Sequence, residues 1–210
     1  MDAALEAGAD MVGLVFFPPS PRSVSPEEGA RLAARARGRA LVVALTVDAG
    51  DGLLDSIMAQ AKPDMLQLHG QESPARVSEI RKRSGVPVMK ALPVQAPEDL
   101  DNAPAFAAVA DWLLFDARPP KDATRPGGHG RAFDWSLLDR LERPRPIMLS
   151  GGLDADNVAH AIRVVRPDAV DVSSGVESAP GVKSPQKIQS FVANARAAAV
   201  ALAAVTEKAS

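Results

Sequence analysis

Apolar residues recur along the chain in short runs, and longer stretches of mixed character separate these runs. Several runs are almost continuously apolar, which is typical of the buried strands of a parallel sheet. Seven such runs are present, at residues 11–17, 40–47, 65–70, 87–94, 111–117, 146–152 and 169–175. This alternation of strand and helix predicts a parallel sheet that is covered on its outer face by helices.

The segments between the runs carry the signals that begin and end helices. In SPEEGARLAARARG, Ser25 can cap a helix, Pro26 suits its first position and Gly38 can stop it. Ser73 precedes a second helix in the same way, and either Asp154 or Asp156 precedes a third. The C-terminal tail predicts a closing helix with a frayed end.

The ends of the apolar runs favour a closed barrel over an open, doubly wound sheet. Nearly every run ends on its C-terminal side in polar or glycine-rich sequence, as in TVD, QLHG, FDAR, SGG and SSG. An open sheet gathers ligand groups mainly at one switch point, whereas a barrel collects them from all of its strand ends. We therefore expect an α/β fold of the (βα)8 TIM-barrel type, as a single domain over residues 1–210.

One strand of that barrel is missing from the pattern. The chain opens with a helical segment at residues 1–10, and the first strand begins at Met11. A barrel without its first strand has two unpaired strand edges, which favour aggregation or pairing with another strand. We expect either that the true coding start lies upstream or that the chain is a truncated product.

Composition excludes several classes of function. The chain has 46% hydrophobic and 24% charged residues and a formal net charge of -2, so nothing draws it generally to nucleic acid or to a membrane. No apolar run approaches the roughly 18 residues that span a bilayer, and no signal peptide is evident, which predicts a cytoplasmic protein. The absence of cysteine excludes disulfides, thiolate zinc sites and cysteine nucleophiles within these residues.

Two glycine-rich strand ends predict a phosphate site. Gly151 and Gly152 follow one run, and Ser173, Ser174 and Gly175 end the next. Backbone N–H groups and helix N-termini at such turns can bind a phosphate monoester, and barrels commonly do so after strands seven and eight. The alternative is that these glycines only permit tight turns.

Two charged residues near strand ends are candidates for catalysis or substrate binding. Asp116 ends the apolar run WLLFDA, where a partly desolvated carboxyl can act as a general acid; the alternative is an ion pair with Arg118 or Lys121. Arg22 lies in a proline-stiffened loop that can present its guanidinium to a carboxylate, and the alternative is a solvated loop arginine.

Gln67 and His69 share one face of a strand end, where a lone histidine is more often structural than catalytic. No metal-ligand spacing accompanies them, so we expect no metal. The long loop at residues 118–133 predicts a functional lid, followed by a capping Asp134 and an anchoring Trp135.

These motifs together resemble phosphoribosylanthranilate isomerase of tryptophan biosynthesis. The resemblance covers about residues 3–191 and is carried by GLVFFPPSPRSVSP, LQLHG, VMKAL, LLFDA, GGHGRAFDW, LSGGLDADNV and VDVSSGVESAPGVKSPQKI. It implies a (βα)8 barrel that performs a cofactor-free Amadori rearrangement of N-(5-phosphoribosyl)anthranilate, as a monomer or homodimer. It further implies that Asp116 is the general acid, that Arg22 holds the anthranilate carboxylate, and that the glycine and serine turns hold the phosphate. Gln67, His69 and Gly128 are the other substrate-binding residues that it implies.

The chain departs from the family pattern at the general base. That base is a cysteine in a KICG-like motif on the first strand, and the chain has neither that strand nor any cysteine. His129, the third position of GGHG, also differs from the small residue expected there, so no role is assigned to it. Two alternatives stay open: another phosphosugar barrel, such as a pentose-phosphate epimerase, and a non-catalytic barrel that binds phosphorylated ligands. An epimerase should show metal-binding His and Asp residues on several strands, and this chain does not.

Overall fold

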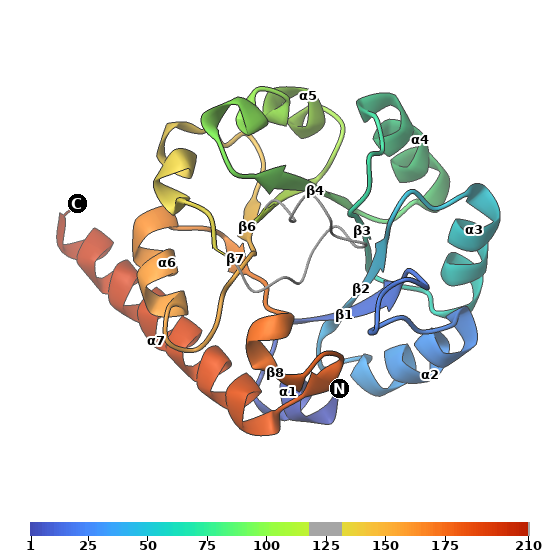
Figure 1. Cartoon of the computed structure of the whole chain (residues 1–210), viewed down its shortest axis with the longest axis horizontal. Coiled ribbons are helices and arrows are strands. Elements are labelled where there is room, and N and C mark those ends of the chain that lie inside the picture. Colours follow the sequence, from blue (N-terminus) through green and yellow to red (C-terminus); the bar gives the residue numbers. More distant parts are fainter. Residues whose placement is uncertain (118–131, 210) are drawn as a thin grey trace.

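Seven parallel strands form one sheet that curls into a ring, and helices surround it on the outside (Figure 1). The computed structural model describes residues 1–117 and 132–209. Each strand pairs with its neighbours in chain order, from β1 to β7. The strands are β1 (Met11–Phe16), β2 (Leu41–Thr46), β3 (Met65–Leu68), β4 (Val88–Val94), β5 (Trp112–Ala117), β6 (Ile147–Leu149) and β7 (Ala169–Val170). The predicted α/β barrel-type fold with seven visible strands is confirmed.

The helices lie between the strands in sequence, as the alternating pattern predicts. They are α1 (Asp2–Glu6), α2 (Pro26–Ala36), α3 (Asp51–Gln60), α4 (Pro74–Ser84), α5 (Ala103–Ala107), α6 (Val158–Val165) and α7 (Pro185–Ala209). Three 3₁₀ helices, η1 (Pro97–Leu100), η2 (Trp135–Arg140) and η3 (Ser174–Val176), and a small antiparallel hairpin of β8 (Glu177–Ala179) and β9 (Val182–Lys183) complete the described elements.

Most of the predicted helix caps are present. The side chain of Ser25 accepts a hydrogen bond from the backbone N–H of Glu28, and that of Ser73 accepts one from Arg76. Asp134 caps η2 by accepting from the N–H of Ser136. At the third helix the side chain of Asp154 likewise accepts from the N–H of Asn157, three residues on, although the α-helix α6 itself spans only Val158–Val165.

Two strands are much shorter than predicted. The run at 146–152 ends as a strand at Leu149, because Gly151 and Gly152 have φ angles of 85° and 67°, outside the range of extended backbone. The run at 169–175 keeps only Ala169 and Val170 in strand pairing. Among the strands of the described part of the chain β7 pairs with β6 alone and β1 with β2 alone, and the other edge of β1 carries only an isolated bridge between Val15 and Ser23, so the ring has an open seam between β1 and β7.

Side chains alternate between the inside of the ring and the helical layer. An inner cluster of buried side chains lies along the axis and consists of Val43, Met65, Met89, Ala91, Leu114 and Met148. The intervening residues of the same strands, such as Leu66, Leu113 and Phe115, belong to the larger core beneath the helices. Since alternate strand residues face the same side, a residue two positions after an inner-cluster residue faces the interior of the ring.

Helix α7 tests the expectation that no segment is long and apolar enough to span a membrane. By length and composition alone Pro185–Val205 passes that test, so the expectation was too strict. The helix nevertheless buries Ile188, Phe191 and Ala198 in the core and packs along α6 and α1. A single helix of this kind is weak support for a membrane span.

Candidate active site

Four polar side chains form a layer above the inner cluster, toward the C-terminal ends of the strands. Gln67, Asp116, Ser150 and Asp171 each come two residues after an inward-facing apolar residue of β3, β5, β6 and β7. Gln67 and Asp116 are each 6% exposed and Ser150 is 7% exposed. Buried polar groups are costly without partners, so their convergence at one end of the ring marks this end as the candidate site.

A chain of hydrogen-bonding contacts runs from Gln67 through His69 to Asp116. Gln67 Nε2 lies 3.0 Å from His69 Nδ1, and His69 Nε2 lies 3.2 Å from Asp116 Oδ2. If the Gln67 amide donates to Nδ1, the neutral imidazole carries its proton on Nε2 and donates it to Asp116. Asp116 Oδ1 accepts from the N–H of Ala117 at 2.8 Å, so both carboxyl oxygens have a donor. Gln67 and His69 therefore lie on one face of the strand end, as predicted, and the structure adds the contact between them.

A buried ion pair supports the turn that carries His69. Lys90 Nζ donates to the carbonyls of Leu68 and Gly70, at 3.1 and 2.7 Å, and to the carboxylate of Glu72 at 2.9 Å. The two carbonyls flank His69 in sequence, and the Lys90 and Glu72 side chains are each 3% exposed. The pair lies on the outward face of the sheet, and its hydrogen bonds hold the His69 turn in place from that side.

The two glycine-rich strand ends are in contact with each other and with Asp116. A Cβ on Gly151 would lie 2.8 Å from Asp116 Oδ1, and one on Gly175 would lie 1.9 Å from the carbonyl oxygen of Leu153. Only glycine permits these approaches without displacing the neighbouring backbone. The turns at 151–153 and 173–175 therefore meet at the same end of the ring as Asp116.

The two glycine-rich turns carry backbone N–H groups without an acceptor among the described residues. Within residues 1–117 and 132–209, the N–H groups of Gly151, Gly152 and Gly175 donate to no protein acceptor. Lys183 Nζ lies beside them, because it donates to the carbonyl of Ser173 at 2.8 Å. Free N–H groups next to an ammonium form a typical anion site.

Arg22 is an ion-paired residue and not a solvated one. Its Nε and Nη2 donate to Glu177 Oε1 and Oε2 at 2.6 and 2.7 Å, and the two side chains are 10% and 5% exposed. The hydrogen bonds come from a residue of the loop after β1 and a residue of the hairpin after β7, so the ion pair crosses the seam of the ring. Sequence reasoning missed Glu177, since its partner is 155 residues away.

Asp171 is a second site carboxyl that sequence reasoning missed. Its Oδ2 accepts from Ser150 Oγ at 3.0 Å. Burial raises the pKa of Asp171, the Ser150 hydrogen bond lowers it, and the nearby Asp116 charge raises it further. The signal that could have found it is its place two residues after Ala169, on the inward face of β7.

This raised pKa predicts that Asp171→Asn stabilises the folded chain at neutral pH. Because the folded state holds the Asp171 proton more tightly than the unfolded state, the carboxyl's contribution is favourable at low pH and is lost as pH rises through the folded pKa. We expect Tm of the variant to exceed that of the unaltered chain at pH 8 by about 2–4 °C, the shift that 1 kcal/mol produces in a domain of this size. Near pH 4 the two should coincide in thermal melts.

Asp55→Asn is the matched control. Hydrogen bonding from Arg83 lowers the pKa of the exposed Asp55 carboxyl, which is the opposite direction. That variant should therefore gain no stability at pH 8. An equal gain in both variants, or a gain for Asp171→Asn that does not depend on pH, would contradict the prediction.

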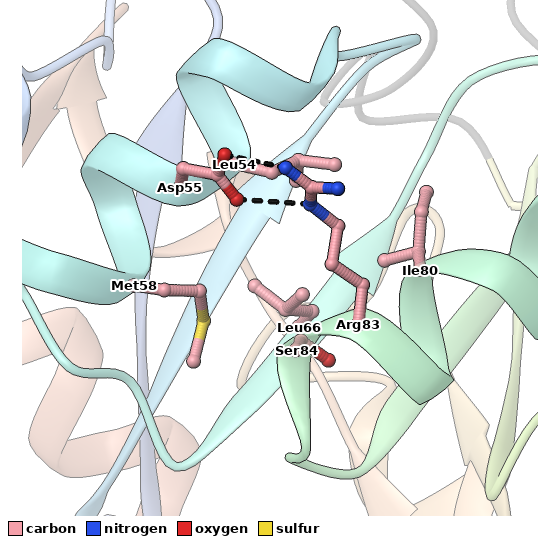
Figure 2. Close-up of a pocket in the computed structure, with 7 residues that line it drawn as sticks. All are labelled: Leu54, Asp55, Met58, Leu66, Ile80, Arg83 and Ser84. Carbon is pink, nitrogen blue, oxygen red and sulfur yellow. Dashed lines mark hydrogen bonds and ion pairs between the residues drawn. The ribbon is translucent and has the colours of Figure 1, made fainter.

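Two other features lie apart from the candidate site. Gly128, Arg118, Lys121 and most of the predicted lid fall outside the described residues. A pocket between α3 and α4, lined by residues including Leu54, Met58 and Leu66 and bordered by the Asp55–Arg83 ion pair, lies on the outer side of the sheet (Figure 2). Because Leu66 belongs to the outer core, this pocket does not open into the ring.

Comparison with known proteins identifies the family. The family model for N-(5'-phosphoribosyl)anthranilate (PRA) isomerase matches residues 1–194. The chain belongs to this family. The N-(5'-phosphoribosyl)anthranilate isomerase of Rhodopseudomonas palustris (strain BisA53) is 62% identical over 196 residues, covering 93% of this chain and 90% of that protein.

Solved structures agree with the family assignment. The phosphoribosyl anthranilate isomerase of Thermotoga maritima superposes with a TM-score of 0.83 at 37% identity, over 93% of this chain and 92% of that one. A phosphoribosyl anthranilate isomerase in complex with reduced 1-(o-carboxyphenylamino)-1-deoxyribulose 5-phosphate superposes with a TM-score of 0.78 at 35% identity, over 93% and 91% of the two chains. The resemblance identified from the sequence motifs is confirmed.

Proposed function

We propose that this chain catalyses the Amadori rearrangement of N-(5-phosphoribosyl)anthranilate to 1-(2-carboxyphenylamino)-1-deoxyribulose 5-phosphate in tryptophan biosynthesis. The observation that carries the proposal is the meeting of Asp116, the His69 contact and the two glycine-rich turns at one end of the ring, in a chain of the isomerase family. The reaction needs an acid and a base and no cofactor. We infer a cytoplasmic enzyme that acts as a monomer or a homodimer on a small phosphorylated substrate.

In this proposal Asp116 protonates the ribose ring oxygen. The bond between that oxygen and C1 breaks, and the anilino nitrogen supplies the electron pair that forms the iminium. His69 holds the Asp116 carboxyl in place, and the Gln67 amide can turn to partner the imidazole in either charge state. General acid catalysis of this kind typically contributes about 10²- to 10⁴-fold.

Removal of the proton from C2 then gives the enaminol, which becomes the ketone product when C1 gains a proton and the C2 hydroxyl loses one. Cysteine, the base expected from the family motif, does not occur in the 210 residues. We therefore infer that these residues bind the ligand well but complete this step slowly.

The phosphate is assigned to the turns at 151–153 and 173–175. The N–H groups of Gly151, Gly152 and Gly175, which have no acceptor among the described residues, and the ammonium of Lys183 support this assignment. Ser173 and Ser174 add hydroxyl groups at the same turn. The phosphate end of the ligand would lie beside β6 and β7, with the sugar ring reaching toward Asp116.

Calorimetry with reduced 1-(o-carboxyphenylamino)-1-deoxyribulose 5-phosphate tests the proposal without requiring turnover. We expect saturable binding to the 210-residue chain, at least about 10-fold tighter than binding of ribose 5-phosphate, because the second ligand lacks the carboxyphenyl group. In a parallel turnover assay the same chain should be slow. Absence of binding would refute the proposed substrate, and fast turnover would refute the inference about the base.

A further inference from the structure

Glu177 lies at the centre of a cluster of cations at the rim of the ring. Besides the two hydrogen bonds from Arg22, its Oε1 lies 3.0 Å from Lys183 Nζ. Lys187 Nζ donates to the backbone carbonyl of Glu177 at 2.8 Å. Glu177 therefore contacts three cations, two through its carboxylate and one through its backbone carbonyl, and the cluster keeps a net positive charge of +2 by this count, three minus one.

The Glu177 carboxylate stays ionised over the working pH range. Burial raises its pKa, but hydrogen bonds from Arg22 and Lys183 outweigh this and lower it to about 2. The ion pair with Arg22 thus persists from acidic to alkaline conditions. A lasting contact of this kind holds the guanidinium in one orientation.

The hydrogen bonds to Glu177 leave one edge of Arg22 unused. A guanidinium has five N–H donors, and Glu177 occupies the Nε–H and one Nη2–H. Neither Nη1 nor the second Nη2–H donates to any residue that the structure describes. The Nη1–Nη2 edge can therefore donate to a second carboxylate with the same two-point geometry, and the cluster's residual positive charge favours an anion.

The hairpin that carries Glu177 is itself packed against the Arg22 loop. A Cβ on Gly181, whose φ is 82°, would lie 2.9 Å from the carbonyl oxygen of Pro21. Glu177 also lies two residues after Gly175, which contacts Leu153. The same short segment therefore holds Arg22 on one side and the glycine-rich turns on the other.

We propose that Glu177 is a positioning residue that aims the free edge of Arg22 at a ligand carboxylate. The inference rests on the proposed function for the nature of the ligand, an aryl carboxylate joined to a sugar phosphate. Glu177 makes no contact with the ligand itself. It sets the orientation of the group that does, so its loss reduces selectivity for the carboxylate.

The test compares two ligands by calorimetry. One is reduced 1-(o-carboxyphenylamino)-1-deoxyribulose 5-phosphate, and the other is the matching phenylamino compound without the carboxylate. We expect Glu177→Gln to weaken binding of the first about 10-fold, the loss of one well-oriented charged contact, and to leave binding of the second unchanged. Arg22→Lys, which keeps the charge but lacks the planar two-point edge, should do the same.

A double variant tests whether Glu177 acts through Arg22 or contributes to binding independently. If Glu177 acts through Arg22, the double variant Glu177→Gln with Arg22→Lys should bind no more weakly than Arg22→Lys alone. Asp55→Asn is the control, since its carboxylate accepts from Nε and Nη2 of Arg83 at 2.9 and 2.6 Å in the same geometry (Figure 2). It should alter neither affinity.

The outcomes separate this inference from the proposed function. Binding of both ligands by Glu177→Gln as tightly as by the unaltered chain would overturn the inference alone. Equal weakening of both ligands would show a merely structural role and would also overturn it. Failure of the unaltered chain to bind either ligand would refute the proposed function and this inference with it.

Discussion

A parallel strand that carries a cysteine, fused so that it can pair between β1 and β7, should raise isomerase turnover of the 210-residue chain by about 10²- to 10⁴-fold. Among the described residues, the seam leaves the outer edge of β7 without a partner and the outer edge of β1 with only the isolated bridge between Val15 and Ser23. An apolar strand with a KICG-like end would pair there and bring a thiolate to the same rim as Asp116. Turnover is measured by the disappearance of substrate.

The same strand should also stabilise the fold. Met11 and Ala169, on the strands that border the seam, are only partly buried against the inner cluster. A strand in the seam would cover them and pair the two edges, so Tm should rise.

A serine version of the strand is the control that separates pairing from chemistry. It should give the same rise in Tm but little of the rise in turnover, because an alcohol is a far weaker base than a thiolate. If the serine and cysteine versions were equally active, the base would have to lie elsewhere. High activity in the chain without any added strand would lead to the same conclusion.

The pattern of apolar runs was sufficient to predict the sheet, and the capping residues were sufficient to predict most of the helix starts. The runs at 11–17 and 111–117 form strands nearly as predicted. A strand between the interior of the ring and the helices is buried on both faces, which a continuously apolar run satisfies. The run at 169–175 lost most of its pairing. It lies at the seam, where only one neighbour can supply hydrogen bonds.

Site residues could be predicted from the sequence only where their position at a strand end marks them. Asp116, Gly151 and Gly175 stand at strand ends, and the structure brings all three to one rim. Glu177 could not be found in this way, since its importance comes from an arginine 155 residues earlier. The β8–β9 hairpin was missed for a related reason: strands of three and two residues are too short to show a period.

Asp116→Asn, made in the chain that carries the added cysteine strand, should abolish turnover, with a fall in kcat of about 10²- to 10⁴-fold. Asparagine has nearly the same shape as aspartate and can still accept from the N–H of Ala117, so the site should keep its form. It has no acidic proton to give to the ribose ring oxygen. KM and the affinity for the reduced product analogue should therefore change much less than kcat.

Asp111→Asn is the matched control, because Asp111 lies just before β5 at the opposite end of the same strand. Asp111 pairs with Arg81 through two hydrogen bonds of 2.8 and 2.6 Å and accepts from the N–H of Val88. Its removal should lower Tm, since it breaks contacts that hold α4 to the sheet, while kcat of the folded enzyme stays near that of the parent. Burial raises the pKa of Asp111, but its hydrogen bonds outweigh this and lower it, so this loss of stability should be larger at pH 7 than near pH 3. Near-normal kcat in Asp116→Asn, with the analogue still bound, would show that the ring oxygen receives its proton from another group, of which His69, in contact with Asp116, and Asp171, in the polar layer, are candidates.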